Sequence, residues 1–109
     1  MSYEYRLLLD STVSAQHVMN SLMLSEACVK AQAREVYLKD QELQTPAEYD
    51  ARLTQEGNQS IWMEINLKSV NLYKLVHSSL SGGVVRCYED GDLDDEVSLK
   101  EAFRIKVKK

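Results

Sequence analysis

The sequence predicts an α+β domain in which a mostly antiparallel sheet carries two helices on one face. Three observations predict this class. Some segments place apolar side chains at every second position, others space them three and four residues apart, and 109 residues suffice for one hydrophobic core. Apolar residues make up 44% of the chain and charged residues 28%, as in typical soluble domains. We therefore expect residues 1–109 to form a single domain.

The N-terminal third predicts a strand, a helix and a second strand. Alternating apolar side chains predict a strand over 3–9. Ser11, Thr12 and Ser14 are available helix caps, and apolar residues at helical spacing after them predict a helix over about 15–25. The next segment, 26–39, mixes alanines that favour a helix with residues that favour a strand. We predict a strand over 33–39 and note that a helix is the alternative.

The middle of the chain predicts a short helix and then a strand. Thr45 is a possible N-cap, Pro46 suits the first helical position, and Glu48 is placed to complete a capping box. These signals predict a surface helix over 46–56. The clearest alternation of apolar and polar residues follows, over 61–67, and predicts a strand at or near the centre of the sheet.

The C-terminal third predicts another helix and two strands. Ser69 is suited to cap a helix over 70–81, which two glycines terminate. A strand is predicted over 84–88 and a final strand over 102–108, with a helical turn before the latter because 98–101 carries a capping box. This order of elements predicts a split βαβ (ferredoxin-like) layout with an extra short helix.

Charge and composition exclude several classes of protein. Thirteen basic and seventeen acidic residues give a net charge of −4, which disfavours binding to nucleic acid or anionic lipid. The sequence begins with neither a secretory signal nor a membrane-spanning segment, so we expect a cytoplasmic protein with no nucleic-acid or membrane partner. Cys28 and Cys87 lie far apart in the sequence, and free thiols are expected.

An acidic segment is the most unusual feature of the chain. Six of the eight residues in 89–96 are acidic and none is basic. Asp90, Asp92 and Asp94 have the spacing of a calcium-binding loop, but Asp95 stands where such a loop needs glycine. We therefore predict no metal site. A calcium-binding module is kept as an alternative, beside two other interpretations: a solvated turn, or a recognition surface that pairs with basic residues of a partner.

Trp62 is the second candidate for a binding residue. It lies on the opposite face of its strand from the apolar residues Ile61, Met63 and Ile65, so it faces away from the predicted core. The predicted helix over 46–56 is one element that would cover it. If nothing covers Trp62, it becomes an interface anchor, because aromatic side chains dominate binding hot spots.

The sequence contains no catalytic signature. No two potential metal ligands have the short spacing of a zinc site, no glycine-framed nucleophile elbow surrounds a serine, and no phosphate-binding loop is present. We predict no catalytic residue, no metal and no cofactor. The residues considered and set aside are His17, His77, Cys28, Cys87, Ser78, Ser79 and Ser81.

The chain resembles the immunity proteins that bacteria carry beside polymorphic toxins of the Rhs and contact-dependent types. The resemblance rests on the Tyr3-Glu4-Tyr5-Arg6-Leu7 segment, the Ile61-Trp62-Met63-Glu64-Ile65 segment and the acidic run. It implies a cognate toxin domain, such as an ADP-ribosyltransferase, a nuclease or a deaminase, whose active site this chain blocks without doing chemistry itself. We expect the partner-binding residues to be Trp62, Asp90, Asp92, Asp94, Asp95 and Glu96.

A non-catalytic structural or adaptor domain that self-associates through a sheet edge is the alternative function. The predicted strand carrying Phe103, Ile105 and Val107 is the candidate edge. Its flanking lysine and arginine residues oppose edge-to-edge pairing. A homodimer is therefore possible but not favoured.

Overall fold

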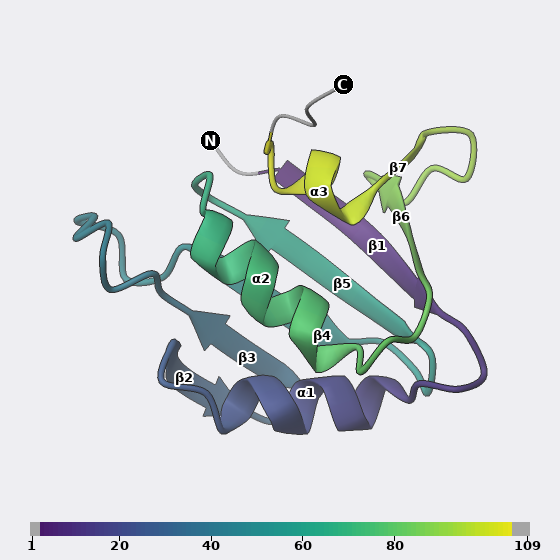
Figure 1. Ribbon diagram of the computed structural model, residues 1–109, viewed down its shortest axis with the longest axis horizontal. Helices are drawn as coiled ribbons and strands as arrows, with labels where there is room; N and C mark the ends of the chain where they lie inside the picture. The colour runs from purple at the N-terminus through teal and green to yellow at the C-terminus, as the bar shows by residue number, and fades with distance from the viewer. Residues whose placement is uncertain (1–2, 106–109) are drawn as a thin grey trace.

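The computed structural model describes residues 3–105, which form seven strands and three helices of an α+β fold (Figure 1). The general class expected from the sequence is confirmed. In chain order the elements are β1 (Tyr3–Leu9), α1 (Ala15–Met23), β2 (Cys28–Gln32), β3 (Glu35–Leu38), β4 (Ala51–Gln55), β5 (Ser60–Ile65), α2 (Val70–Ser79), β6 (Val85–Glu89), β7 (Glu96–Val97) and α3 (Leu99–Ala102).

The strands form one sheet with the order β2-β3-β4-β5-β1-β6-β7, and every neighbouring pair is antiparallel. The N-terminal strand therefore lies inside the sheet, between β5 and β6. Helix α2 connects these two strands, whereas α1 connects β1 to the far edge strand β2. All three helices lie on the same side of the sheet (Figure 1).

The core fills the space between the sheet and the helices. Alternate residues of β1, β4 and β5 point into it, as the period-two pattern predicts, and α1 and α2 each bury one apolar face. The largest fully buried side chains are those of Tyr5, Phe103, Leu7, Leu22, Leu38, Leu53, Ile61, Met63, Ile65, Leu72, Val18 and Val36.

Three helix starts follow the sequence signals. The hydroxyl of Ser14 accepts a hydrogen bond from the first turn of α1, and that of Ser69 does the same for α2. Ser98 and Glu101 form the expected capping box at the start of α3. The predictions for 3–9 and 70–81 are confirmed apart from the helix end, and the strand expected over 61–67 is β5.

The helix predicted over 46–56 is wrong. Residues 51–55 form strand β4, and the residues before it form a loop. Thr45 does not cap a helix because its hydroxyl serves tertiary contacts: it accepts a hydrogen bond from Lys39 Nζ at 2.8 Å and donates one to Asp50 Oδ1 at 2.8 Å. Buried Ala51 and Leu53 alternate with half-buried Arg52, and this period-two pattern is that of a strand.

The ambiguous segment 26–39 folds as the hairpin β2–β3. Strand β3 falls within the predicted range of 33–39, but β2 was not predicted. Ala33 at the turn has a φ of 48°, a left-handed conformation that usually requires glycine or asparagine. The turn residues Ala33 and Arg34 therefore give no hairpin signal in the sequence.

The strand predicted over 102–108 is wrong where the structure describes it. Ala102 belongs to α3 and Phe103 is fully buried against the core, with its ring centroid 6.0 Å from that of Tyr73. Residues 106–108 lie outside the described residues. The edge strands of the described sheet are β2 and β7, so self-association through Phe103 is not available.

The ferredoxin-like layout is not confirmed. The described sheet has seven strands, and the β2–β3 hairpin stands between α1 and the strand β4 that pairs with β5. Within residues 3–105, no helix has both the length and the apolar character needed to cross a membrane.

Candidate binding face on the open side of the sheet

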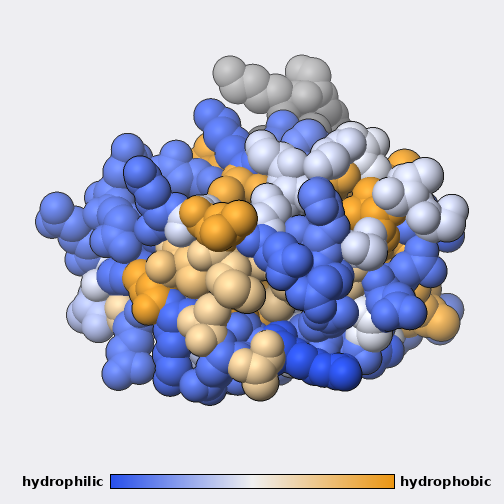
Figure 2. Space-filling view, turned by 90° about the horizontal axis from the view of Figure 1, so that it is seen from below, coloured by the Kyte–Doolittle hydropathy of each residue, from blue (hydrophilic) through white to orange (hydrophobic). Residues whose placement is uncertain are grey.

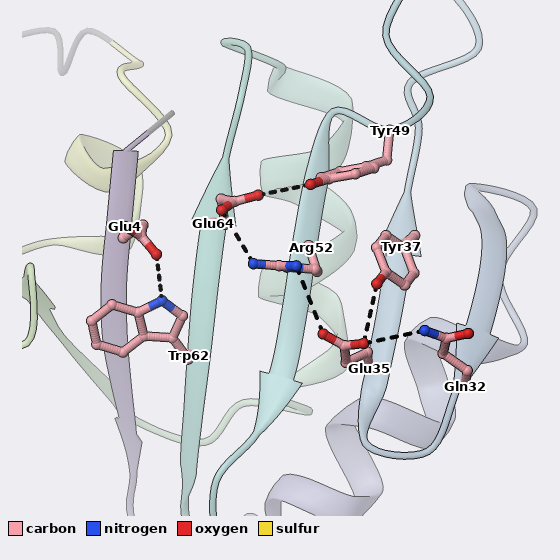
Figure 3. Close-up of polar contacts among 8 residues, drawn as sticks. All are labelled: Glu4, Gln32, Glu35, Tyr37, Tyr49, Arg52, Trp62 and Glu64. Carbon is pink, nitrogen blue, oxygen red and sulfur yellow. Dashed lines mark hydrogen bonds and ion pairs between the residues drawn. The ribbon is translucent and has the colours of Figure 1, made fainter. Parts of the chain in front are cut away.

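One face of the sheet is covered by helices, and the described residues place no helix on the other. The strand register aligns a row of side chains across this open face. The row crosses six strands, from β3 to β7, in the order Glu35, Thr54, Trp62, Arg6, Tyr88 and Glu96. Figure 3 views this face with the helices behind the strands. Its polar and aromatic side chains are joined by hydrogen bonds and ion pairs.

Trp62 lies near the middle of the open face and is half-buried. Its indole Nε1 donates a hydrogen bond to Glu4 Oε1 at 3.0 Å (Figure 3). The guanidinium of Arg6 lies 5.4 Å from the ring centroid, within the range of a cation–π contact, and also donates to Glu56 at 3.1 Å. Contacts on two sides therefore fix the orientation of the indole ring.

The acidic segment, not a helix, covers part of Trp62. Gly91 approaches so closely that a Cβ atom built on it would lie 3.1 Å from Trp62 Cζ3 and 3.6 Å from Arg6 Cζ. Gly91 also has a φ of +75°, which side chains rarely tolerate. The structure thus brings together the two candidates that the sequence analysis selected separately.

Backbone hydrogen bonds hold the acidic segment in a defined shape. Asp90 N–H donates to the carbonyl of Glu4 at 2.9 Å, which ties the segment to β1. Asp92 N–H donates to the carbonyl of Glu89 at 3.0 Å, and Glu89 N–H donates to the carbonyl of Asp95 at 3.0 Å. The Asp92 carboxylate accepts from Asp94 N–H at 2.9 Å. A loop restrained in this way loses little conformational freedom on binding.

The acidic side chains differ in whether they are neutralised. Asp90, Asp92, Asp94 and Asp95 are exposed, and none forms an ion pair within residues 3–105. Glu96, by contrast, pairs with Arg86 at 3.3 Å. Within residues 3–105, the loop that contacts Trp62 through Gly91 thus carries four aspartates that form no ion pair.

Leu93 is a surface feature that the sequence analysis missed. It lies inside the acidic loop and is 68% exposed, more than most large apolar residues of the described chain. In the sequence Leu93 is a single leucine among aspartates, and the charge pattern of the segment does not distinguish it. A partner that covers the loop would bury this side chain, and that burial is favourable.

The other end of the open face is organised around Arg52. Its guanidinium lies between Glu35, at 3.8 Å, and Glu64, at 3.3 Å (Figure 3). Burial alone would lower the pKa of Arg52, but Glu64 and the neighbouring groups raise it above its ordinary value. The hydroxyl of Tyr49 donates to Glu64 at 3.0 Å and that of Tyr37 donates to Glu35 at 3.1 Å.

A serine and a histidine meet at a hollow lined by residues 11–14 and 80–83. Ser81 Oγ lies 3.4 Å from His17 Nε2 beside a cavity of about 450 Å³. Both side chains are exposed, and among the hydrogen bonds of residues 3–105 none joins His17 to a carboxylate. A catalytic dyad would need such a group to orient the imidazole, so the contact does not make a hydrolase site.

The described residues also offer little for metal or thiol chemistry. No three histidine, cysteine, aspartate or glutamate side chains within residues 3–105 are placed to hold a metal ion. Both cysteines are free thiols. Burial raises the pKa of Cys87 to about 12, so this thiol is not a nucleophile near neutral pH.

Comparisons of the chain with protein-family models, curated proteins and solved structures find no match. The open face itself is therefore the feature that indicates a function. What this face offers chemically is a fixed indole ring, a restrained loop whose four aspartates form no ion pair within residues 3–105, and an exposed leucine.

Proposed function

We propose that this protein is a non-catalytic inhibitor that binds a basic surface of a protein partner through the acidic loop and Trp62. The observation that carries the proposal is the contact of Gly91 with the Trp62 ring, which joins the loop and the indole into one surface. Clustered charge accelerates encounter and selects complementary surfaces. Aromatic residues beside the charge provide the buried area that affinity requires.

The partner that fits this surface is a toxin domain with a basic active-site cleft. Enzymes that act on nucleic acids or on phosphate-bearing cofactors use arginine and lysine to bind the phosphates. The aspartates of the loop would pair with those cations, and Leu93 would be buried beneath them. Binding there excludes the substrate, so a stoichiometric complex inhibits the partner. The resemblance of the sequence to immunity proteins, which bind and block toxin domains, motivates this choice.

The test is an inhibition assay with the toxin domain encoded beside this chain. Purified toxin is assayed on its substrate with increasing amounts of the wild-type protein and of a variant in which Asp92, Asp94 and Asp95 are each replaced by asparagine. We expect inhibition that saturates at one equivalent of wild type and is weakened in the variant. Glu26→Gln, which removes an exposed carboxylate far from the loop in sequence, is the control and should inhibit like wild type. Full toxin activity in excess wild-type protein contradicts the proposal.

Self-association through β2 is a second candidate function, and a specific observation favours it. β2 is an edge strand, and four of its five residues are exposed. Leu24, just before it, is 88% exposed, and Met23 and Val29 are exposed as well. The view from the side of α1 shows apolar side chains grouped among hydrophilic ones (Figure 2). Pairing of two β2 strands would bury these apolar side chains and give the unpaired backbone N–H and C=O groups of the edge strand hydrogen-bond partners.

Sedimentation equilibrium at increasing protein concentration separates the two proposals. A dimer that Leu24→Glu dissociates would support self-association. A monomer at every concentration would exclude it, and leaves the inhibitor proposal as the one to pursue.

We also propose that the fold is an elaborated ferredoxin-like domain. The sheet order β6-β1-β5-β4, with α2 joining the two strands that flank β1, supports this interpretation. The β2–β3 hairpin and the short elements β7 and α3 would then be additions. An experimental structure of a close homologue that lacks the hairpin but keeps the four central strands would test it, and a homologue with another strand order would contradict it.

A further inference from the structure

Glu4 contacts both of the elements that the proposed binding surface combines. Its side chain accepts the indole N–H of Trp62, with a distance of 3.0 Å between Oε1 and Nε1 (Figure 3). Its backbone carbonyl accepts the N–H of Asp90, in the acidic segment, at 2.9 Å. One residue of β1 therefore holds the Trp62 ring with its side chain and the acidic loop with its main chain.

A third contact, between the loop and the ring, joins the two contacts of Glu4. A Cβ atom built on Gly91 would lie 3.1 Å from Trp62 Cζ3, so the backbone of Gly91 lies against the indole. Glu4, Trp62 and the 90–91 backbone thus form a closed triangle of contacts that connects β1, β5 and the loop after β6. Residues in direct contact are energetically coupled, so a change at one contact of the triangle alters the other two.

The stability of the sheet does not explain why a carboxylate occupies this position. Glu4 lies directly opposite Glu64 in the register of β1 and β5, and like charges at opposed cross-strand positions are unfavourable. Glu64 pairs with Arg52 at 3.3 Å, whereas Glu4 forms no ion pair within residues 3–105. In that part of the chain, the Trp62 indole N–H is the group that hydrogen-bonds the Glu4 carboxylate. The contact with Trp62 is therefore what this carboxylate provides.

We propose that Glu4 is a positioning residue of the recognition surface, which couples the orientation of Trp62 to the position of the acidic loop. The ring and the loop then meet a partner as one preformed unit. A preformed surface loses less conformational freedom on binding, and differences in affinity at one interface appear mainly in the dissociation rate. The effect on binding rests on the proposed function, whereas the coupling itself is a property of the free protein.

The coupling is tested in the free, ¹⁵N-labelled full chain by amide hydrogen exchange. Glu4→Met removes the acceptor and keeps the length of the side chain. We expect the Asp90 amide to exchange about two- to tenfold faster in this variant, the effect of losing one hydrogen bond, and the Trp62 indole N–H signal to shift. Glu4→Gln keeps an oxygen acceptor and should restore the wild-type exchange rate. Glu48→Met makes the same change at an exposed residue outside the triangle and is the matched control.

A second substitution separates coupling from a purely structural role. Trp62→Phe removes the N–H donor and the Cζ3 edge that Gly91 contacts, so the Asp90 amide should exchange at least as fast as in Glu4→Met. The double variant should exchange no faster than Trp62→Phe alone, because the Glu4 carboxylate then has no indole to hold. If Glu4 only stabilised the sheet, the two effects would multiply. Glu4→Met should fold like wild type, because it also removes a charge that opposes Glu64.

The role in binding is measured as the dissociation rate constant of the complex with the toxin domain encoded beside this chain. Glu4→Met should raise this rate constant about two- to tenfold, because the ring and the loop no longer bind as one unit. Glu4→Gln and Glu48→Met should dissociate like wild type.

The outcomes distinguish failure of the coupling from failure of the proposed function. Wild-type exchange of the Asp90 amide in Glu4→Met overturns the coupling, as does an effect of Glu4→Met that persists in the Trp62→Phe background. A toxin complex that dissociates equally fast with wild type and with Glu4→Met overturns the role of Glu4 in binding and leaves the proposed function standing. If wild type binds no toxin, the proposed function and the binding role both fail, whereas faster Asp90 exchange in free Glu4→Met still establishes the coupling.

Discussion

The two faces of the sheet are built on different principles. The face toward the helices is apolar, and its side chains are among the most completely buried in the molecule. The open face uses charged and aromatic side chains that are half-buried and connected by hydrogen bonds and ion pairs (Figure 3). Neighbouring residues of one strand, such as Leu53 and Thr54, belong to different faces.

Under the proposed function, stability and recognition depend on opposite sides of the sheet. Burial of apolar area is the dominant stabilising contribution to folding, whereas exposed ion pairs contribute little. An open face that is not needed for folding is free to carry binding residues. Substitutions on the covered face should therefore reduce stability, and most on the open face should alter recognition instead.

The largest expected effect is in the core. Leu53→Ala removes a fully buried side chain from β4 and should lower the free energy of unfolding by about 2–5 kcal/mol, through lost burial and the cavity that remains. Thr54→Ala, one residue away on the open face, should change it by less than about 1 kcal/mol. Urea denaturation monitored by circular dichroism measures both. Equal losses would contradict the division between the faces.

The next largest effect is expected at the contact between the acidic loop and Trp62. Gly91→Ala places a Cβ against the indole ring and requires a residue with a side chain to adopt a left-handed backbone conformation. We therefore expect the free energy of unfolding to fall by about 1–3 kcal/mol and the Trp62 fluorescence to shift. Gly57→Ala is the matched control because a Cβ there meets nothing within 4 Å. If the two variants behave alike, the loop does not rest on Trp62.

Asp40 provides a smaller, pH-dependent effect at the edge of the covered face. Burial would raise the pKa of its carboxyl, but hydrogen bonds from Ser69, Asn71 and the backbone of Glu42 outweigh burial and lower the pKa. A carboxyl group with a lowered pKa stabilises the fold above its unfolded value of about 3.9, and this contribution disappears as the pH falls through the folded pKa.

Asp40→Asn should therefore be less stable than wild type at neutral pH, by about 1 kcal/mol, and the difference should shrink in acid. Urea denaturation at neutral pH and below the unfolded pKa measures it. If the stability difference between wild type and Asp40→Asn stays constant or grows in acid, the charge of Asp40 does not stabilise the fold.

The smallest effect is expected from the ion pair between Arg86 and Glu96 on the open face. Both side chains are largely exposed, at 64% and 45%, so their coupling should be below about 1 kcal/mol and should decrease with salt. A double-mutant cycle with Arg86→Gln and Glu96→Gln measures the coupling. A large coupling that is independent of salt would mean that the open face also supports the fold.

Local signals predicted much of the fold. Alternation placed β1 and β5, and serine caps placed the starts of α1, α2 and α3. The failures have tertiary causes. The helix signals before β4 lost to contacts that Thr45 makes with Lys39 and Asp50, and the β2–β3 turn uses a left-handed alanine that no turn pattern announces.

The candidate site was predictable only in its parts. The acidic run and the outward position of Trp62 can be read from the sequence. Their contact depends on β1 being placed between β5 and β6, which brings Gly91 to the indole ring across nearly thirty residues of sequence. The contact between the Tyr37 and Tyr49 rings likewise needs the β3–β4 pairing and the loop before β4, neither of which the sequence analysis anticipated.

The most direct test of the proposed function is the salt dependence of association with the neighbouring toxin domain, measured by stopped flow. Wild-type protein should associate rapidly at low salt and more slowly as salt rises, because the exposed aspartates steer the encounter. The variant with Asp90, Asp92, Asp94 and Asp95 replaced by asparagine should associate more slowly at low salt and respond less to salt. Identical rate constants for the two proteins at low salt would contradict a role of the acidic loop in recognition.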